Sequence, residues 1–202
     1  MDSRVQIFSN YIEVTAPSNI AFVKYWGKKG NQLPANPSLS MTLKNSKTIM
    51  EVGIKDGKSL SSVDFEFFNE EKMKVSSEFF SEKIQKYFQQ LERNYGELPY
   101  QIKIKSYNTF PHSCGIASSA SSFACLAAIY FYLQKKDLQK KLNLSPEDLN
   151  LISDYARQGS GSSCRSILPG FNLWGNFEAK TKKFGFSGRD DYAVNLNHIV
   201  SI

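Results

Sequence analysis

The stretch GIASSASSFACLAAIYFYL, residues 115–133, decides how the rest of the chain is interpreted. From Ile116 to about Leu133 it is rich in alanine and apolar on most sides, which predicts a largely buried helix. Gly115 would let the backbone approach a ligand closely, and the first turn of the helix offers unpaired N–H donors and the positive end of the helix dipole. The sequence therefore predicts a loop that meets a buried helix at a point suited to a phosphate chain.

The same small residues have a second interpretation, because they also allow tight packing between helices. The stretch contains neither the Walker pattern GxxxxGK[ST] nor the dinucleotide pattern GxGxxG. Taken alone, it leaves phosphate binding and tight packing equally open.

Short segments rich in β-branched and aromatic residues surround this helix and are broken by proline, glycine or asparagine. They predict strands at residues 11–17, 20–26, 38–43, 47–54, 62–68, 100–106 and 171–178.

Two further segments have the pattern of helices. Apolar residues recur at helical spacing in 81–93. The segment 145–158 begins with Ser145 at the cap, Pro146 at the first helical position and Asp148 three residues after the cap, which predicts a capping box. Since no linker or repeat interrupts the chain, we expect one α+β domain over residues 1–202.

Composition excludes several classes of protein. A chain of 202 residues that is 41% hydrophobic can bury a real core. It has no apolar run of the ~18–20 residues that a membrane span needs and no signal-peptide pattern, so we expect a cytoplasmic protein without membrane partners. Three cysteines without CxxC spacing predict reduced thiols, and only two histidines argue against a zinc site.

The formal net charge of +6 leaves nucleic acid, an acidic surface or an anionic small molecule as partners. The lysine doublets at 135–136, 140–141 and 182–183 are dispersed among acids and uncharged residues. They are typical of solvated edges and do not form the basic stripe of a nucleic-acid-binding face.

Two further segments use residues that bind anions. APSNIAFVKYWGKKGNQLPANPSLSMTL, residues 16–43, places lysines at a strand end before a Pro-Asn-Pro turn. RQGSGSSCRS, residues 157–166, predicts a Gly-Ser loop followed by Arg165. Lysine supplies a point charge, glycine and serine N–H groups form an anion-binding nest, and arginine forms a fork for carboxylate or phosphate. Three such loops indicate a polyphosphate substrate as well as a nucleotide.

Together these segments resemble the mevalonate diphosphate decarboxylase family of the GHMP kinase superfamily. The resemblance runs from Ala16 to Trp174. It rests on Ala-Pro-x-Asn-Ile-Ala-x-x-Lys-Tyr-Trp-Gly-Lys, on Gly-x-Ala-Ser-Ser-Ala and on Gly-Ser-Gly-Ser-x-x-Arg-Ser. It implies the N-terminal domain of a GHMP kinase, a ribosomal-protein-like, left-handed β-α-β fold with a mixed sheet and helices packed on one side.

The resemblance also implies a reaction, the ATP- and Mg²⁺-dependent conversion of (R)-5-diphosphomevalonate to isopentenyl diphosphate, phosphate, ADP and CO2. This carboxy-lyase step belongs to the mevalonate pathway of isoprenoid biosynthesis. Phosphorylation of the tertiary 3-hydroxyl is followed by loss of that phosphate, and the positive charge developing at C3 draws electrons from the breaking bond to the carboxylate.

The resemblance implies roles for individual residues. Lys24 would lie near the transferring phosphoryl group, Arg165 would orient the carboxylate, and Tyr25 and Lys28 would hold the diphosphate. The implied substrate residues are Tyr25, Trp26, Gly27, Lys28, Ser160, Gly161, Ser162, Ser163, Cys164 and Arg165, and the implied ATP residues are Asn36, Ser38, Ser113, Gly115, Ala117, Ser118 and Ser119, with no side chain binding metal.

Each role has an alternative from the residues alone. The lysines could be ordinary strand-end charges, Trp26 could be a core aromatic, and Arg165 could pair with Asp154. In place of the Pro-Thr-Ala-Ala-Gly-Leu found in many relatives, this chain has Pro-His-Ser-Cys-Gly-Ile at 111–116, and at 36–38 it has Asn-Pro-Ser in place of Asn-Ser-Ser.

The catalytic aspartate of the family has no equivalent in this sequence. Asp190 and Asp191 stand in the wrong context and are interpreted as a solvated turn. We therefore expect the chain to be the N-terminal, ligand-cradling part of a longer enzyme whose C-terminal domain is absent, with a homodimer of the full-length enzyme left open. Alternatives are a phosphomevalonate decarboxylase, a mevalonate 3-kinase, or a non-catalytic domain that binds anions or nucleic acid.

Overall fold

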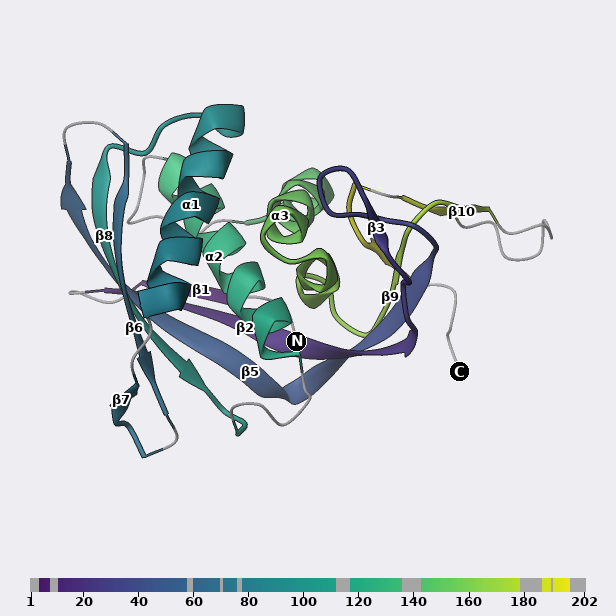
Figure 1. Ribbon diagram of the computed structural model, residues 1–202, viewed down its shortest axis with the longest axis horizontal. Helices are drawn as coiled ribbons and strands as arrows, with labels where there is room; N and C mark the ends of the chain where they lie inside the picture. The colour runs from purple at the N-terminus through teal and green to yellow at the C-terminus, as the bar shows by residue number, and fades with distance from the viewer. Residues whose placement is uncertain are drawn as a thin grey trace.

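The computed structural model describes residues 4–7, 11–57, 60–69, 71–75, 78–111, 117–135, 143–178, 187–189 and 191–196. In this part of the chain three α-helices lie on one face of an eight-stranded sheet (Figure 1). The prediction of an α+β fold with a mixed sheet and helices on one side is confirmed.

The main sheet runs in the order β1 (Arg4–Ile7), β2 (Ile12–Val23), β5 (Ser38–Asp56), β8 (Tyr100–Asn108), β6 (Ser62–Phe68) and β7 (Lys74–Val75), with β9 (Phe171–Trp174) and β12 (Val194–Asn195) joined to the first part of β5. Two small hairpins complete the described strands: β3 (Lys28–Lys29) with β4 (Leu33–Pro34), and β10 (Phe177–Glu178) with β11 (Ser187–Gly188).

The β-α-β unit that the resemblance implied is formed by β6, α1 (Glu78–Tyr95) and β8. β6 and β8 are parallel neighbours, whereas the other described strand pairs are antiparallel. A parallel pair needs a crossover connection, and α1 lies within that crossover. The predictions for 62–68, 81–93 and 100–106 are confirmed, with α1 beginning three residues before the predicted start and ending two residues after the predicted end.

Four of the predicted strands are wrong in their boundaries. Residues 12–23 form one strand and residues 38–56 form another, where the sequence predicted two strands each. β2 continues past Pro17 because register shifts between Pro17 and Asn19 and between Ala21 and Val23 absorb the irregularity. β5 is one continuous strand because it pairs with β2 along most of its length. It also pairs with β9 in its first part and with β8 in its second part.

The predicted strand at 171–178 is interrupted at Gly175. That residue has φ of 111°, a conformation that favours glycine, and it separates β9 from β10. A Cβ atom at Gly175 would lie 2.7 Å from the Cα of Pro37, so this turn also needs the small residue to pass the chain near the site.

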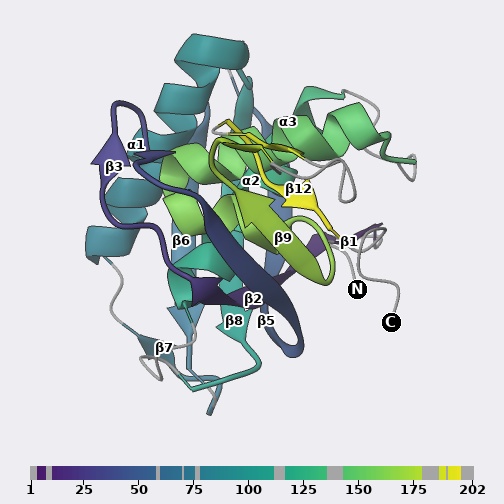
Figure 2. The ribbon, with the colours of Figure 1, turned by 90° about the vertical axis from the view of Figure 1, so that its right-hand side faces the viewer.

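The predicted buried helix is α2 (Ser118–Gln134), which is buried on nearly all of its faces and joins the sheet to the other helices. In Figures 1 and 2 it lies over the sheet, where it contacts β2 and β5 and packs beside α3. Although α2 is apolar, no helix within the described ranges has both the length and the apolar character needed to cross a membrane.

Helix α3 (Pro146–Gly159) begins with the predicted capping box. The Oγ of Ser145 accepts from the N–H of Asp148 at 3.1 Å, and the Asp148 carboxylate accepts from the N–H of Ser145 at 3.1 Å. The helix leads directly into a short 3-10 helix, η1 (Gly161–Ser166), which lies against the start of α2 and the end of β2.

Candidate functional site

The start of α2 lies against η1 and against β2, although these segments are far apart in sequence. The Oγ of Ser163 donates to the carbonyl of Ser119 at 3.1 Å, and the Oγ of Ser18 donates to the carbonyl of Ala117 at 3.3 Å. The structure thus brings together all three segments that the sequence singled out as anion-binding.

Asn19 joins β2 to η1 and was not identified as a functional residue from the sequence. Its side-chain amide donates to the carbonyl of Ser162 at 3.1 Å and to the Oγ of Ser166 at 2.7 Å. Its side chain is nearly fully buried. The signal that could have identified it is its place in the Ala-Pro-x-Asn pattern, whose residues 16–19 are all buried in β2.

The chain leaves β2 at Val23 and turns through residues 24–27. The Oδ1 of Asn36 accepts from the N–H of Trp26 at 2.6 Å, and its Nδ2 donates to the carbonyl of Lys24 at 3.2 Å. Asn36 therefore fixes the backbone that carries Lys24 and Tyr25. Trp26 is 75% exposed, so its interpretation as a core aromatic is wrong.

The segment predicted as a Gly-Ser loop is helical. α3 extends to Gly159, and the N–H of Ser163 donates to the carbonyl of Ser160 at 2.8 Å as the 3-10 turn begins. The sequence suggested a loop because glycine and serine disfavour long helices, but a short 3-10 turn tolerates them. The hydroxyls of Ser160 and Ser162 lie 3.5 Å apart and are partly accessible.

Gly161 allows the Trp174 ring to pack closely against η1. A Cβ atom at this position would lie 2.8 Å from the Cη2 of Trp174 and 3.4 Å from the hydroxyl of Tyr25. The Tyr25 and Trp174 rings meet edge to face with centroids 4.8 Å apart. A larger residue at 161 would therefore clash with the Trp174 ring, against which Tyr25 packs.

Arg165 lies beneath these rings and is only 2% exposed. Its guanidinium carbon lies 5.7 Å from the Tyr25 ring centroid and 5.6 Å from that of Trp174, and its Nη1 donates to the buried hydroxyl of Ser38. Its Nε has no hydrogen-bond partner. Burial lowers the pKa of the guanidinium from its ordinary value.

No acid neutralises this guanidinium in the part of the chain that the structure describes. The alternative pairing with Asp154 is wrong, because Asp154 forms its ion pair with Arg157. Burial raises the pKa of Tyr25, and burial raises the pKa of the Cys164 thiol to about 12, so both neighbours are neutral at pH 7. The result is a buried cation among uncharged groups, which suits an anionic ligand.

The start of α2 offers a second place for an anion. Ala117 at the cap has left-handed φ and ψ of 36° and 54°, no side chain caps the helix, and no acidic residue lies in the first turn. Ser118 is partly exposed and Ser119 is exposed. Backbone N–H groups at such a helix end can bind phosphate oxygens.

The other predicted site residues differ in burial and position. Lys24 and Lys28 are exposed at the rim, whereas Ser38, Ser163 and Cys164 are buried around Arg165. Gly27 has φ of 81° at the turn before β3. The predicted ATP contacts Ser113 and Gly115 lie outside the described residues. Within those residues, no three His, Cys, Asp or Glu side chains gather in a way that could hold a metal ion.

Comparison with known proteins shows the family of the chain. The family model of the diphosphomevalonate decarboxylase-like N-terminal domain matches residues 16–184. Diphosphomevalonate decarboxylase ERG19 of Gibberella zeae is 37% identical over 198 residues, which cover 91% of this chain and 47% of that protein.

Solved structures are similar as well. A structure describing the mevalonate diphosphate mediated ATP binding mechanism of the mevalonate diphosphate decarboxylase from Enterococcus faecalis has a TM-score of 0.66 and 30% identity, covering 92% of this chain and 51% of that one. MDDEF in complex with MVAPP, AMPPCP and magnesium has a TM-score of 0.64 and 30% identity, covering 92% of this chain and 50% of that one. The chain thus spans about half the length of the relatives it matches.

Proposed function

The chain belongs to the diphosphomevalonate decarboxylase-like family, and from that membership we propose that it is the N-terminal part of an enzyme that decarboxylates (R)-5-diphosphomevalonate with ATP. Residues 1–202 would form its GHMP-kinase-type N-terminal domain, and the catalytic aspartate would come from a further domain. The setting would be the mevalonate pathway in the cytoplasm.

The observation that carries this proposal is the buried, unneutralised guanidinium of Arg165. A buried charge without an opposite charge is unfavourable, and native proteins retain such a group where a ligand completes it. Arg165 lies where the three segments meet, beneath Tyr25 and beside Ser38. The carboxylate of a mevalonate derivative has the charge and the two-oxygen shape that a guanidinium binds.

The rest of the substrate would extend from Arg165 towards the exposed Lys28. Tyr25 and Lys28 would hold the diphosphate, with Trp26 and Gly27 beside it. The short helix η1 would surround the remaining part of the substrate through Ser160, Gly161, Ser162, Ser163 and Cys164. The partly accessible hydroxyls of Ser160 and Ser162 support this, since they can donate to phosphate or carboxylate oxygens.

ATP would lie at the start of α2. The uncapped N–H groups at Ala117, Ser118 and Ser119 support a phosphate there, and Gly115 and Ser113 would contribute from the adjacent segment. Asn36 and Ser38 would line the nucleotide side. Magnesium would be held chiefly by phosphate oxygens, because the described side chains form no cluster for it, and it would neutralise charge on the phosphates. The complex of MDDEF with MVAPP, AMPPCP and magnesium supports the binding of a nucleotide and magnesium, which that similar protein holds together with MVAPP.

The chemistry follows from placing these charges. Lys24 would neutralise charge on the phosphoryl group as it passes to the 3-hydroxyl oxygen, forming an O–P bond as the bond to ADP breaks and the hydroxyl proton passes to the catalytic aspartate of the further domain. The new phosphate then leaves C3 with the C–O electrons. The bond between C2 and the carboxylate breaks next, its electrons form the C=C bond, and CO2 is released while Arg165 orients the carboxylate.

Calorimetry on the chain tests the binding half of this proposal. Mevalonate diphosphate is expected to bind, 5-phosphomevalonate more weakly and mevalonate weakest, because each lost phosphate removes contacts to Tyr25 and Lys28. Equal affinity for 5-phosphomevalonate or mevalonate would instead favour a phosphomevalonate decarboxylase or a 3-kinase. No response to any of the three, together with salt-dependent oligonucleotide binding, would contradict the proposal and favour a nucleic-acid-binding domain.

Turnover is tested on the gene product that extends beyond residue 202. We expect ADP and CO2 to be released in equal amounts from mevalonate diphosphate. Release of ADP without CO2 would identify a 3-kinase and contradict the decarboxylase.

A further inference from the structure

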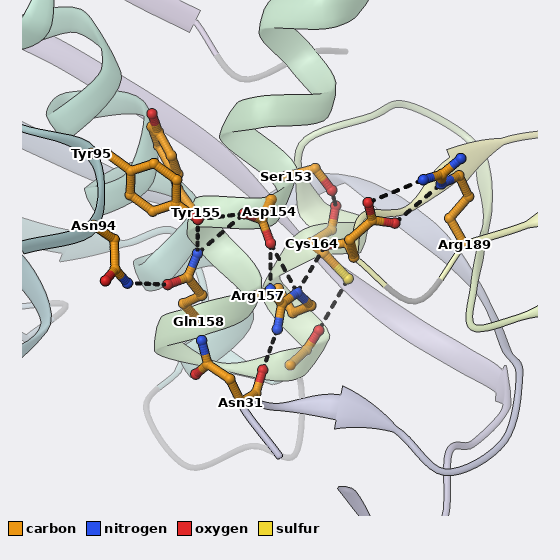
Figure 3. A network of polar contacts seen from close by, with 12 residues as sticks. Asn31, Asn94, Tyr95, Ser153, Asp154, Tyr155, Arg157, Gln158, Cys164 and Arg189 are labelled. Carbon is orange, nitrogen blue, oxygen red and sulfur yellow. Dashed lines mark hydrogen bonds and ion pairs between the residues drawn. The ribbon is translucent and has the colours of Figure 1, made fainter. Parts of the chain in front are cut away.

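A second buried arginine, Arg157 near the end of α3, joins three separate segments. Its Nη2 pairs with the Oδ1 of Asp154 on the same helix, and its Nε donates to the same oxygen at 3.1 Å. Its Nε also donates to the carbonyl of Asp191 at 2.8 Å, and its Nη1 donates to the carbonyl of Asn31. Figure 3 shows the guanidinium between Asp154 and Asn31.

The Asp154 carboxylate is itself fixed in position. Its Oδ2 accepts from the hydroxyl of Tyr95 at 2.8 Å and from the Nε2 of Gln158 at 3.1 Å, and the same Gln158 nitrogen donates to the Tyr95 hydroxyl at 2.7 Å (Figure 3). The side chain of Arg157 is 6% exposed and that of Asp154 is 18% exposed. The orientation of Arg157 is therefore set by the packed helices α1 and α3.

Asn31 lies at the tip of the hairpin 27–34, which is formed by β3 and β4. Two residues beside it, Gly30 and Gln32, have φ of 45° and 60°, and Gly27 at its base has φ of 81°. Such a run of left-handed conformations costs free energy, particularly at Gln32, and persists where surrounding contacts hold it. Among the described contacts at the tip, the hydrogen bond from Arg157 to the Asn31 carbonyl is the one made by a charged group. The Nε2 of Gln90 also lies 3.5 Å from the Oδ1 of Asn31, at the limit of a hydrogen bond.

The hairpin carries Lys28 and follows directly from Tyr25 and Trp26. Displacing its tip would move the backbone of Lys28, since only a few residues separate the two. We propose that Arg157 is a positioning residue that holds the 27–34 hairpin against α3 so that Lys28 faces a diphosphate. The ligand part of this inference rests on the proposed function, whereas the contact between hairpin and helix does not.

The hairpin contact is tested by limited trypsin digestion of the chain, because Lys28 and Lys29 are exposed cleavage sites within the hairpin. Arg157→Lys keeps a positive charge beside Asp154 but lacks the fork that reaches Asn31 and Asp191 together. We expect cleavage after residues 28 and 29 to become about ten- to a hundredfold faster, as the open hairpin gains population. Cleavage after Lys86, within α1, should not change and reports global unfolding.

Two further variants keep the experiment decisive. The double variant Asp154→Asn with Arg157→Gln removes both charges together and therefore leaves no unpaired buried charge. It replaces the single variant if Arg157→Lys fails to fold. Arg189→Lys is the matched control, because Arg189 forms an exposed pair with Asp191 and has no described contact to the hairpin. The double variant should behave as Arg157→Lys does, and the control as the unchanged chain.

Calorimetry with mevalonate diphosphate then tests positioning. Both Arg157 variants should bind about tenfold more weakly, since only the closed fraction is competent. If the Arg157 variants are cleaved after residues 28 and 29 no faster than Arg189→Lys, the contact between Arg157 and the hairpin is overturned. If they are cleaved faster but bind mevalonate diphosphate with unchanged affinity, the positioning role is overturned. If the unchanged chain does not bind mevalonate diphosphate, the proposed function fails, and the digestion alone decides whether Arg157 holds the hairpin.

Discussion

Two buried arginines of this protein differ in one respect that decides what each contributes. Arg157 faces the carboxylate of Asp154, whereas Arg165 faces only neutral groups among the described residues. A paired buried charge supports folding once it is present, but an unpaired one opposes folding. The two side chains therefore give a direct comparison between a structural charge and a charge kept for a ligand.

Replacing each arginine with methionine should separate these roles. Arg165→Met should leave the free energy of unfolding unchanged or raise it by about 1 kcal/mol, because an unpaired buried charge is removed. Arg157→Met should lower it by about 3–5 kcal/mol, because Asp154 is left without its partner. Urea denaturation measures both, and an Arg165→Met variant as unstable as Arg157→Met would show that Arg165 is structural.

At the residue scale, the sequence indicated those candidate site residues whose chemistry depends on local pattern. Arg165 after a Gly-Ser segment and lysines at a strand end could be identified in this way. Asn19 could not, because its partners Ser162 and Ser166 lie in a distant segment. The partner of Asp154 could not be chosen either, since two arginines stand close to it in sequence and only packing selects Arg157.

At the scale of elements, helix α3 stabilises the fold through its start and positions the candidate site through its end. Its start is fixed by the capping box at Ser145, and its last turn carries Arg157 and leads into η1. A weaker start should therefore lower stability without changing the contacts of the site itself.

The capping box offers a matched pair of variants. Ser145→Ala removes the acceptor for the N–H of Asp148 and should lower the free energy of unfolding by about 1 kcal/mol. Ser145→Asp retains a capping oxygen and should remain within a few tenths of a kcal/mol of the unchanged chain. Denaturation curves measure the difference, and equal losses in the two variants would mean that the cap contributes nothing.

Helices were easier to predict from this sequence than strands. The cap and the apolar spacing of 81–93 and 145–158 are local signals, so α1 and α3 lie where expected. β5 runs through the polar residues Lys44, Asn45 and Ser46, which locally favour a turn, because β2 pairs with it on both sides of this point. Strand pairing is a contact between distant segments, so no local pattern predicts where such a strand continues.

For the whole molecule, the buried thiols and phenols predict a loss of stability in alkali. The thiol of Cys164 has an ordinary pKa of 9.0 and a pKa of about 12 in the fold, and the phenol of Tyr155 rises from 10.0 to about 12. Above pH 9 the unfolded chain releases a proton from Cys164 that the folded chain keeps. The contribution of this thiol is therefore fully present below pH 9 and is lost as pH rises towards 12.

Urea denaturation between pH 7 and 11 measures this dependence. Above pH 9 the free energy of unfolding should fall by up to about 1.4 kcal/mol per pH unit for Cys164 alone. Cys164→Ala should reduce the slope in this range. A free energy that stays constant up to pH 11 would contradict the burial of these groups.

The central proposal concerns the whole molecule: three segments far apart in sequence would form one site for two phosphorylated ligands. The structure joins them through Ser163 and Ser119, through Asn19 and Ser162, and through Arg165 beneath Tyr25. A ligand bound at that site should therefore change the environment of backbone amides in all three segments.

The most direct test is a backbone amide NMR titration of the chain with mevalonate diphosphate and a non-hydrolysable ATP analogue. We predict that the amide resonances of residues 24–28, 117–119 and 160–166 all shift once both ligands are present. In the titration with each ligand, the resonances that respond should reach saturation at the same ligand concentration. Shifts confined to one segment, or scattered over exposed lysines elsewhere, would contradict the single pocket.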